Sequence, residues 1–187
     1  MRLGIFGGTF DPPHVGHLLV AVDAVEHLSL DRLVFVPTAS QPLKLGAVRA
    51  TATQRLAMVR LLVGDDTRFA VDPIEIERSG LSYSVDTLAE YARREPDAER
   101  FFLVGADVVR TFDKWREPAR VLSLAKMVVL TRDDDTVAIP DGAAPLRSRR
   151  IDVSSTEIRA RVAARQSLRG FVPEPVAAYI ADERLYR

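Results

Sequence analysis

The sequence predicts a single-domain α/β fold in which a parallel β-sheet of five to six strands carries helices on both faces. Its 187 residues are enough for one buried core, and 47% of the residues are apolar. Short runs rich in Val, Ile and Phe alternate with stretches of helical periodicity, a pattern typical of parallel strands joined by helices. No repeat, low-complexity tract or linker interrupts the chain, so we expect one domain over residues 1–187.

Six apolar runs are predicted to be the strands of this sheet. They cover residues 2–6, 32–36, 69–76, 100–104, 126–131 and 149–153. Strands that alternate with helices in this way form a Rossmann-like sheet. In such sheets ligands bind beyond the carboxyl ends of the strands, at the point where the strand order reverses.

Helices are predicted between the strands, over residues 15–27, 53–63, 84–94 and 173–185. In the first helix the apolar residues recur at spacings of three and four, which predicts one buried face. These residues are Val15, Leu18, Leu19, Val22 and Val25. Two stretches lack periodicity. Residues 38–50 are expected to form a mobile loop, and residues 133–148, which include an Asp run, a solvated excursion.

The composition excludes several classes of protein. Lys plus Arg and Asp plus Glu both number 26, so the chain lacks the basic excess of most nucleic-acid-binding domains. There is no cysteine, which excludes disulfides, thiolate zinc sites and a cysteine nucleophile. No apolar stretch is long enough to span a membrane and no leader is visible, so we expect a cytoplasmic protein.

The most informative segment runs from Gly7 to His17 and reads GGTFDPPHVGH. It follows the first apolar run and leads into the first helical pattern. A strand, a glycine-rich turn and a helix N-terminus together form a cradle for phosphate groups. Gly7 and Gly8 allow backbone amides to approach phosphate oxygens, while His14 and His17 add side-chain donors one helical turn apart.

This segment has two other interpretations. The glycines alone could mark a tight turn with a helix cap. The H-x-x-H pair could bind zinc, but there is no cysteine to complete such a site and His27 lies about three turns away. The histidines and glycines together favour phosphate, and we predict no metal site made by protein side chains.

A second motif, at residues 153–159, again joins an apolar run to a helix. Ser154 and Glu157 have the spacing of a capping box. Arg159 is unusual there, because the helix dipole disfavours a cation near a helix N-terminus. A bound polyphosphate would reverse that preference. Ser155 and Thr156 would then add hydroxyl groups to a second phosphate clamp.

A third candidate group follows the fourth predicted strand. Asp107 comes two residues after Gly105 and could accept hydrogen bonds from ribose hydroxyls, or could equally cap the next helix. Trp115 lies between Lys114 and Arg116, and this polar setting indicates an exposed ring that can stack on a flat ligand.

The H-x-G-H and S-S-T-x-I-R motifs resemble those of the nucleotidyltransferase superfamily. Within it, the chain is similar to the bacterial nicotinate-nucleotide adenylyltransferases. Further matches are the segment SYSVDTL at 82–88, Gly105 and Asp107 followed by Trp115, and the pairs 179–180 and 185–186. The resemblance spans nearly the whole chain.

This resemblance implies adenylyl transfer from ATP to nicotinate mononucleotide in NAD biosynthesis, giving nicotinate adenine dinucleotide and pyrophosphate, with Mg²⁺ carried by ATP. Catalytic roles fall on His14, His17, Lys44 and Arg159. Further ATP contacts fall on Gly7, Gly8, Thr9, Phe10, Gly105, Asp107, Ser155 and Thr156. Acceptor contacts fall on Ser82, Tyr83, Ser84 and Trp115. We expect folding to bring Arg159 beside the histidine pair, so that both hold one polyanion.

One segment departs from the family pattern. Where the family has P-P-H-K, this chain has Gln41, Pro42, Leu43 and Lys44, so the histidine of that loop is missing. The acceptor could also be nicotinamide mononucleotide or another phosphorylated compound. A non-catalytic nucleotide-binding regulator is a further alternative. We expect small-molecule partners, no nucleic acid and no membrane, and the sequence leaves a homo-oligomer open.

Overall fold

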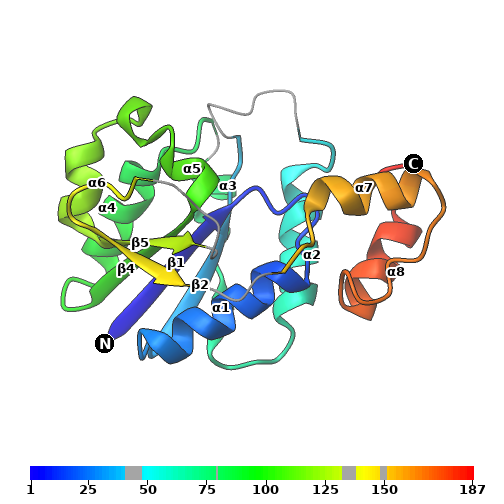
Figure 1. The fold of residues 1–187 in the computed structure, drawn as a ribbon, viewed down its shortest axis with the longest axis horizontal. Helices are drawn as coiled ribbons and strands as arrows, with labels where there is room; N and C mark the ends of the chain where they lie inside the picture. Colours follow the sequence, from blue (N-terminus) through cyan, green and yellow to red (C-terminus); the bar gives the residue numbers. More distant parts are fainter. Residues whose placement is uncertain (41–47, 79, 132–137, 148–150) are drawn as a thin grey trace.

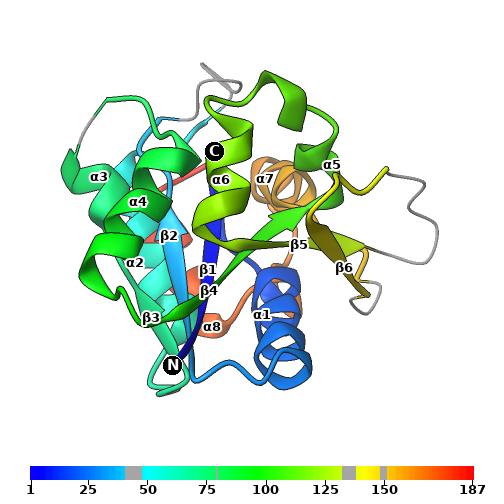
Figure 2. The same cartoon turned by 90° about the vertical axis from the view of Figure 1, so that its left-hand side faces the viewer.

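A computed structural model describes residues 1–40, 48–78, 80–131, 138–147 and 151–187. Within these ranges, six parallel strands form one sheet in the order β3-β2-β1-β4-β5-β6 (Figures 1 and 2). The strands are β1 (Arg2–Gly8), β2 (Arg32–Pro37), β3 (Phe69–Val71), β4 (Glu99–Gly105), β5 (Lys126–Thr131) and β6 (Ala143–Arg147). This is the strand order of a doubly wound sheet, and it confirms the predicted fold class.

Helices cover both faces of the sheet. One face is covered by α1 (Val15–His27) and α2 (Ala52–Val63), and beyond them lie α7 (Ser155–Ala163) and α8 (Glu174–Asp182) (Figure 1). The other face is covered by four helices and a short 3₁₀ turn. These are α3 (Ile74–Arg78), α4 (Ser84–Arg94), α5 (Ala106–Val109), η2 (Phe112–Lys114) and α6 (Pro118–Leu124).

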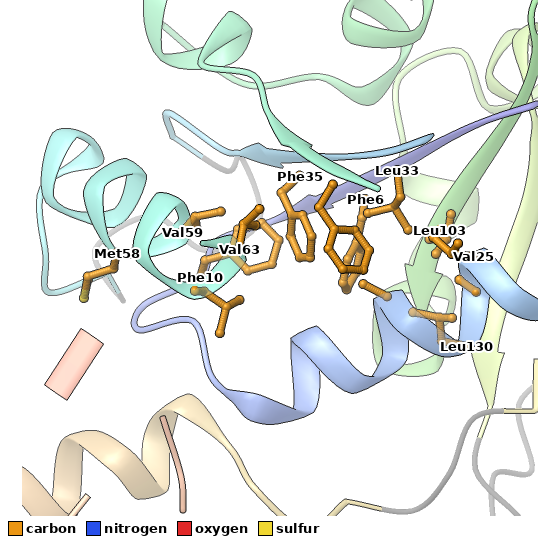
Figure 3. Close-up of a cluster of buried hydrophobic side chains, with 14 of the residues drawn as sticks. Phe6, Phe10, Val25, Leu33, Phe35, Met58, Val59, Val63, Leu103 and Leu130 are labelled. Atoms are coloured by element: carbon orange, nitrogen blue, oxygen red, sulfur yellow. The ribbon is translucent and has the colours of Figure 1, made fainter. Parts of the chain in front are cut away.

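Alternating residues of each central strand supply the two cores. In β2, Leu33 and Phe35 face α1 and α2, whereas Val34 and Val36 face the opposite helices. Figure 3 shows Phe35 close to Phe6 and Phe10 in the first of these cores. Because strand side chains alternate between faces, apolar residues at nearly every position allow the sheet to be buried on both sides.

Two predicted strands are wrong in part. Residues 69–76 were expected to be one strand, but β3 ends at Val71 and Ile74 begins a helix. Pro73 has no N–H for the ladder, and the Asp72 carboxylate accepts a hydrogen bond from the Ile74 N–H (2.9 Å) at the helix start. The sixth strand is β6 and not residues 149–153, of which 149 and 150 lie outside the described residues. Pro145 is tolerated in β6 because this strand lies at the sheet edge.

The first helix also differs from its predicted face. Its bounds are as predicted, but the buried residues are Gly16, Ala21, Asp23, Ala24 and Val25. The larger apolar side chains, such as Leu18 and Val22, pack only partly buried against the same core. Small alanines on the innermost stripe allow the helix to approach the sheet closely, so the bulky residues lie at its sides.

The two predicted irregular stretches are described only in part. Residues 41–47, which include most of the predicted 38–50 loop, lie outside the described residues, as do 132–137 and 148–150. The predicted excursion at 133–148 is wrong over 143–147, which form β6. In the described ranges, no helix is both long and apolar enough to cross a bilayer.

Candidate active site

A cavity opens at the carboxyl ends of β1, β2 and β4. Its volume of about 1020 Å³, open mouth included, is at the upper end of the ~300–1000 Å³ typical of small-molecule sites. Ile5, Val36, Phe102 and Val104 form its apolar floor. Because the helices after β1 and β4 leave the sheet on opposite faces, the two chains separate here, which is the predicted position for a ligand.

Residues from both predicted halves of the site line this one cavity. They are Gly7, Gly8, Thr9 and Gly105 from the nucleotide half, and Ser82, Tyr83, Ser84 and Trp115 from the acceptor half. The structure therefore brings together residues about a hundred positions apart, while their individual roles remain predictions. Lys114 and Arg116 also line the cavity and add positive charge beside Trp115.

Trp115 is supported by other aromatic rings. Its ring centroid lies 5.3 Å from that of Phe112 and 6.2 Å from that of Phe102, both in edge-to-face geometry. Such pairs hold an aromatic ring in a fixed orientation. Part of the indole is left at the cavity wall, as a ring that stacks on a flat ligand requires.

The two histidines lie at the start of α1, directly after the glycine turn. His14 is the N-cap residue, and its backbone N–H donates a hydrogen bond to Nδ1 of His17 (3.2 Å). The two imidazole rings are 3.8 Å apart between centroids. With Nδ1 as the acceptor, a neutral His17 ring carries its hydrogen on Nε2, which leaves that N–H for another partner.

His17 is held in its neutral form. Burial is the main cause, followed by repulsion from the charge of a protonated His14, and together they hold the pKa of His17 well below its usual 6.5. The Phe10 ring packs edge-on against the His17 ring, with centroids 5.0 Å apart. His17 can therefore act as an uncharged hydrogen-bond donor at neutral pH.

The structure gives a packing reason for two glycines of the first motif. A Cβ on Gly16 would lie 2.9 Å from Nδ1 of His14, and a Cβ on Gly8 would lie 2.7 Å from the Phe10 ring. The ring of His14 is a sufficient reason for glycine at position 16, because it occupies the space that a side chain would need.

The side chain of Phe10 lies in the core, and its backbone is the part that is predicted to contact ATP. Its side chain is buried in the core with Phe6 and Phe35, and its backbone has a φ of 51°, in the left-handed region (Figure 3). Any contact of Phe10 with ATP would have to use its backbone.

Lys44 lies outside the described residues. Asp107 is the second residue of α5, just beyond β4, and its side chain is outside what the structure describes.

The second motif lies against the first, as expected. Arg159 Nη1 donates a hydrogen bond to the backbone oxygen of Asp11 (2.7 Å), and Ser155 Oγ donates one to that of Pro12 (2.8 Å). Arg159 Nη2 also donates to Thr156 Oγ1 (3.1 Å). Ser154 caps α7 by accepting a hydrogen bond from the Glu157 N–H (3.1 Å). The guanidinium of Arg159 thus lies at the loop that ends in His14.

Sequence analysis did not single out Glu75, a buried carboxyl group in the cavity wall. Its Oε1 accepts a hydrogen bond from Thr87 Oγ1 (2.7 Å), while its Oε2 has no partner among the described residues. Burial raises the pKa of Glu75, and the hydrogen bond from Thr87, together with the Ser82 hydroxyl nearby, opposes this effect only in part. Ser82 Oγ also accepts a hydrogen bond from the Ala39 N–H (3.0 Å), so this group ties the acceptor wall to the chain after β2.

Replacing Glu75 with Gln is expected to make stability less dependent on pH. The pKa of Glu75 is higher in the folded state than in the unfolded state, where it is about 4.5. Wild-type stability therefore falls as the pH rises above 4.5. The neutral Gln lacks this loss, and the Tm of Glu75→Gln minus that of wild type should grow with pH. Thermal unfolding from pH 4 to 8 measures this difference. The control is Glu77→Gln, at an exposed position in the same helix. The same pH dependence of the Tm difference in both variants would contradict the prediction.

Arg55 is a second buried charge missing from the predicted site. Only 1% of this residue is exposed, and its guanidinium donates hydrogen bonds to the backbone oxygens of Thr9 (2.7 Å), Thr38 (2.6 Å) and Ala39 (3.1 Å). Burial lowers the pKa of Arg55, and the nearby Asp11 carboxylate raises it in part. Arg55 therefore joins the segments that leave β1 and β2 at the edge of the cavity.

Comparisons with known proteins agree with this geometry. The cytidylyltransferase-like family model matches residues 5–161. A relative from Gemmatimonas aurantiaca, named "probable nicotinate-nucleotide adenylyltransferase", is 52% identical over 197 residues, covering 100% of this chain and 93% of its own. A relative of the same name from Thermus thermophilus is 43% identical over 188 residues and 100% of both chains.

A solved structure shows the same fold. It is the Plasmodium falciparum nicotinic acid mononucleotide adenylyltransferase complexed with NaAD, with a TM-score of 0.78 at 16% identity, over 99% of this chain and 97% of that one.

By its fold and its matching family model, the chain is a nucleotidyltransferase of the cytidylyltransferase-like family. The full-length sequence identity to its relatives narrows the family assignment further. The chain belongs to the family of nicotinate-nucleotide adenylyltransferases.

Proposed function

We propose that this protein transfers the adenylyl group of ATP to nicotinate mononucleotide, giving nicotinate adenine dinucleotide and pyrophosphate. Membership of the family supports this activity, and one structural observation carries it. The cavity at the strand reversal joins the glycine turn after β1 to an aromatic and hydroxyl-lined wall around Trp115. Such a cavity can hold two nucleotides with their phosphates adjacent.

The proposed reaction needs no covalent intermediate. A phosphate oxygen of the mononucleotide attacks the α-phosphorus of ATP in line, a new P–O bond forms, and the bond to the β-phosphate oxygen breaks to release pyrophosphate. The protein then acts by holding both reactants in position and by stabilising the charge spread over the phosphoryl oxygens.

Donors around the first motif would perform this task. The backbone of Gly7, Gly8, Thr9 and Phe10, with His14 and His17, would hold the phosphates of ATP. Ser155, Thr156 and Arg159 would complete the grip from the other side, and Lys44 would meet the β- and γ-phosphates. Gly105 and Asp107 would contact the adenosine side.

Magnesium would arrive on ATP, held by phosphate oxygens and water, as suits an ion that dehydrates reluctantly. In the described part of the chain, no three His, Asp or Glu side chains form a group that could ligate a metal. The donors proposed for the phosphates are neutral or positive, so they fit a metal–nucleotide complex whose remaining charge is negative. Small molecules are the proposed partners, and the cytoplasm is the proposed location.

Pyrophosphate release tests this proposal. The purified protein is incubated with ATP, Mg²⁺ and one of three acceptors: nicotinate mononucleotide, nicotinamide mononucleotide or pantetheine phosphate. We expect release that depends on the acceptor and is fastest with nicotinate mononucleotide. Faster release with another acceptor would change the substrate assignment. Binding of ATP without any release would identify a non-catalytic regulator.

Replacing Trp115 with Ala is expected to raise the KM for the mononucleotide more than the KM for ATP. Loss of stacking on one flat ring is worth about 1–3 kcal/mol, or about 5- to 150-fold. Trp115→Phe keeps an aromatic face and should retain most of the affinity. Steady-state kinetics with each substrate varied in turn measures the effect, and an equal rise in both KM values would mean that Trp115 is only structural.

A further inference from the structure

The side chain of Asp11, inside the first motif, joins parts of the chain that are far apart in sequence. Only 4% of this residue is exposed. Its Oδ2 accepts a hydrogen bond from the Arg49 N–H (2.7 Å). Its Oδ1 accepts one from the Ala50 N–H (3.1 Å) and one from the hydroxyl of Tyr186 (2.7 Å). The chain before α2 and the chain after α8 therefore meet at one buried carboxylate.

The loop around Asp11 is also held by side chains of other helices. The backbone oxygen of Thr9 accepts a hydrogen bond from Arg55, that of Asp11 from Arg159 and that of Pro12 from Ser155. These contacts use the carbonyl groups of the loop and fix its path. His14 follows two residues after Pro12 and caps α1, so the position of this loop sets the position of both imidazoles.

Tyr186 is held in place by its surroundings. Its backbone φ is 62°, in the left-handed region that a bulky side chain rarely adopts, and its ring packs partly buried against the core below α8. Such backbone strain persists only where neighbouring contacts fix the residue. Burial first, and then the hydrogen bond to Asp11, raises the pKa of Tyr186. The phenol therefore remains protonated and donates to Asp11 throughout the neutral pH range.

We propose that Tyr186 is a positioning residue for the ATP phosphates. It donates to Asp11, Asp11 fixes the loop that precedes His14, and the loop fixes the two imidazoles. This inference rests on the proposed function, because it assigns the phosphates of ATP to that loop. Tyr186 itself is not among the described residues that line the cavity, so we assign it a positioning role and not a catalytic one.

The test is the Tyr186→Phe variant, which removes the hydroxyl and keeps the ring. A buried carboxylate that loses one of its donors shifts or draws in water, and the loop moves with it. We expect kcat/KM for ATP to fall about tenfold, the size of effect expected for one hydrogen bond to a charged group. The KM for nicotinate mononucleotide should change less than about twofold, because the acceptor wall is on other elements.

Tyr179→Phe is the matched control. Tyr179 is on α8, is partly buried against the same core, and its hydroxyl has no hydrogen bond within the described residues. Its removal should leave both KM values unchanged. If Tyr186→Phe lowers the Tm but leaves kcat/KM for ATP at the wild-type value, Tyr186 is merely structural and the proposal is overturned.

A binding measurement separates this inference from the proposed function. The Tm shift caused by a non-hydrolysable ATP analogue reports phosphate binding without turnover. It should be smaller for Tyr186→Phe than for wild type, even if wild type proves inactive with nicotinate mononucleotide. An equal shift in both proteins overturns the positioning role, whereas inactive wild type overturns only the substrate assignment.

The Asp11→Asn variant provides a second test of the positioning role of Tyr186. If Tyr186 acts through Asp11, the effects of Tyr186→Phe and Asp11→Asn on binding of the analogue should be strongly non-additive in the double variant. Additive effects would mean that Tyr186 acts independently of Asp11, which contradicts the proposal.

Discussion

Replacing His17 with Ala is expected to lower kcat by about 100- to 1000-fold while changing the KM for ATP only modestly. This is the loss typical of removing one preorganised donor that stabilises charge in a transition state. His17 is suited to such a role because its Nδ1 already accepts a hydrogen bond from the backbone of His14. Its Nε2–H therefore has a fixed direction before the substrate arrives, and no reorganisation is needed during the reaction.

The low pKa of His17 adds a second expectation to the same experiment. Because the ring is neutral at pH 7, raising the pH from 7 to 8 removes no proton from it, and the contribution of His17 to kcat should not decline. A neutral amide can imitate a neutral donor, so His17→Gln should retain more turnover than His17→Ala. His27→Ala, at the other end of the same helix, is the control. Near-normal turnover of His17→Ala would remove His17 from the mechanism.

The sequence predicted best those elements whose hydrophobic pattern is regular. The bounds of α1, α4 and β5 agree with prediction. Prediction failed where one residue decided the outcome. Near Pro73 the strand ends, although the apolar pattern continues beyond it. Pro145 and a burial pattern with only Leu146 buried made the edge strand β6 unrecognisable from the sequence.

The two motifs of the site were local in sequence and could be recognised there. That Arg159 lies at the loop before His14 was expected because both motifs were predicted to end a strand and start a helix, although the strand before the second motif, β6, already ends at Arg147. Two buried carboxyl groups near these motifs, those of Glu75 and Asp11, had no comparable signal. Glu75 lies in a helix of five residues, too short to show a period. Asp11 was part of the quoted motif, but its partners Ala50 and Tyr186 are 39 and 175 positions away.

Arg55 did leave a signal in the sequence. It stands three and four residues before Met58 and Val59, and seven and eight before Leu62 and Val63, all of them buried. Arg55 is therefore on the apolar stripe of α2. A charged residue on such a stripe is rarely buried without partners, so this pattern is a signal of an internal network that the sequence analysis above did not use.

Replacing Arg55 with Met is expected to lower the free energy of unfolding by about 3–5 kcal/mol, because removing one member of a buried charged network leaves the others uncompensated. Methionine fills much of the space of the side chain, so a large loss would report on charge and hydrogen bonding more than on packing. The backbone oxygens of Thr9, Thr38 and Ala39 would lose their donor, and the Asp11 carboxylate would lose its nearby positive charge. Urea unfolding measures the change at constant m-value.

The control for Arg55→Met is Arg60→Met, an exposed arginine of the same helix, which should change stability by less than about 0.5 kcal/mol. The comparison matters because both substitutions remove one charge and have the same effect on helix propensity. If the two variants lose the same stability, the carbonyl groups around Arg55 must find water or other donors at little cost. The segments after β1 and β2 would then not depend on Arg55 for their position, and the cavity they border would have to be held open by the sheet alone.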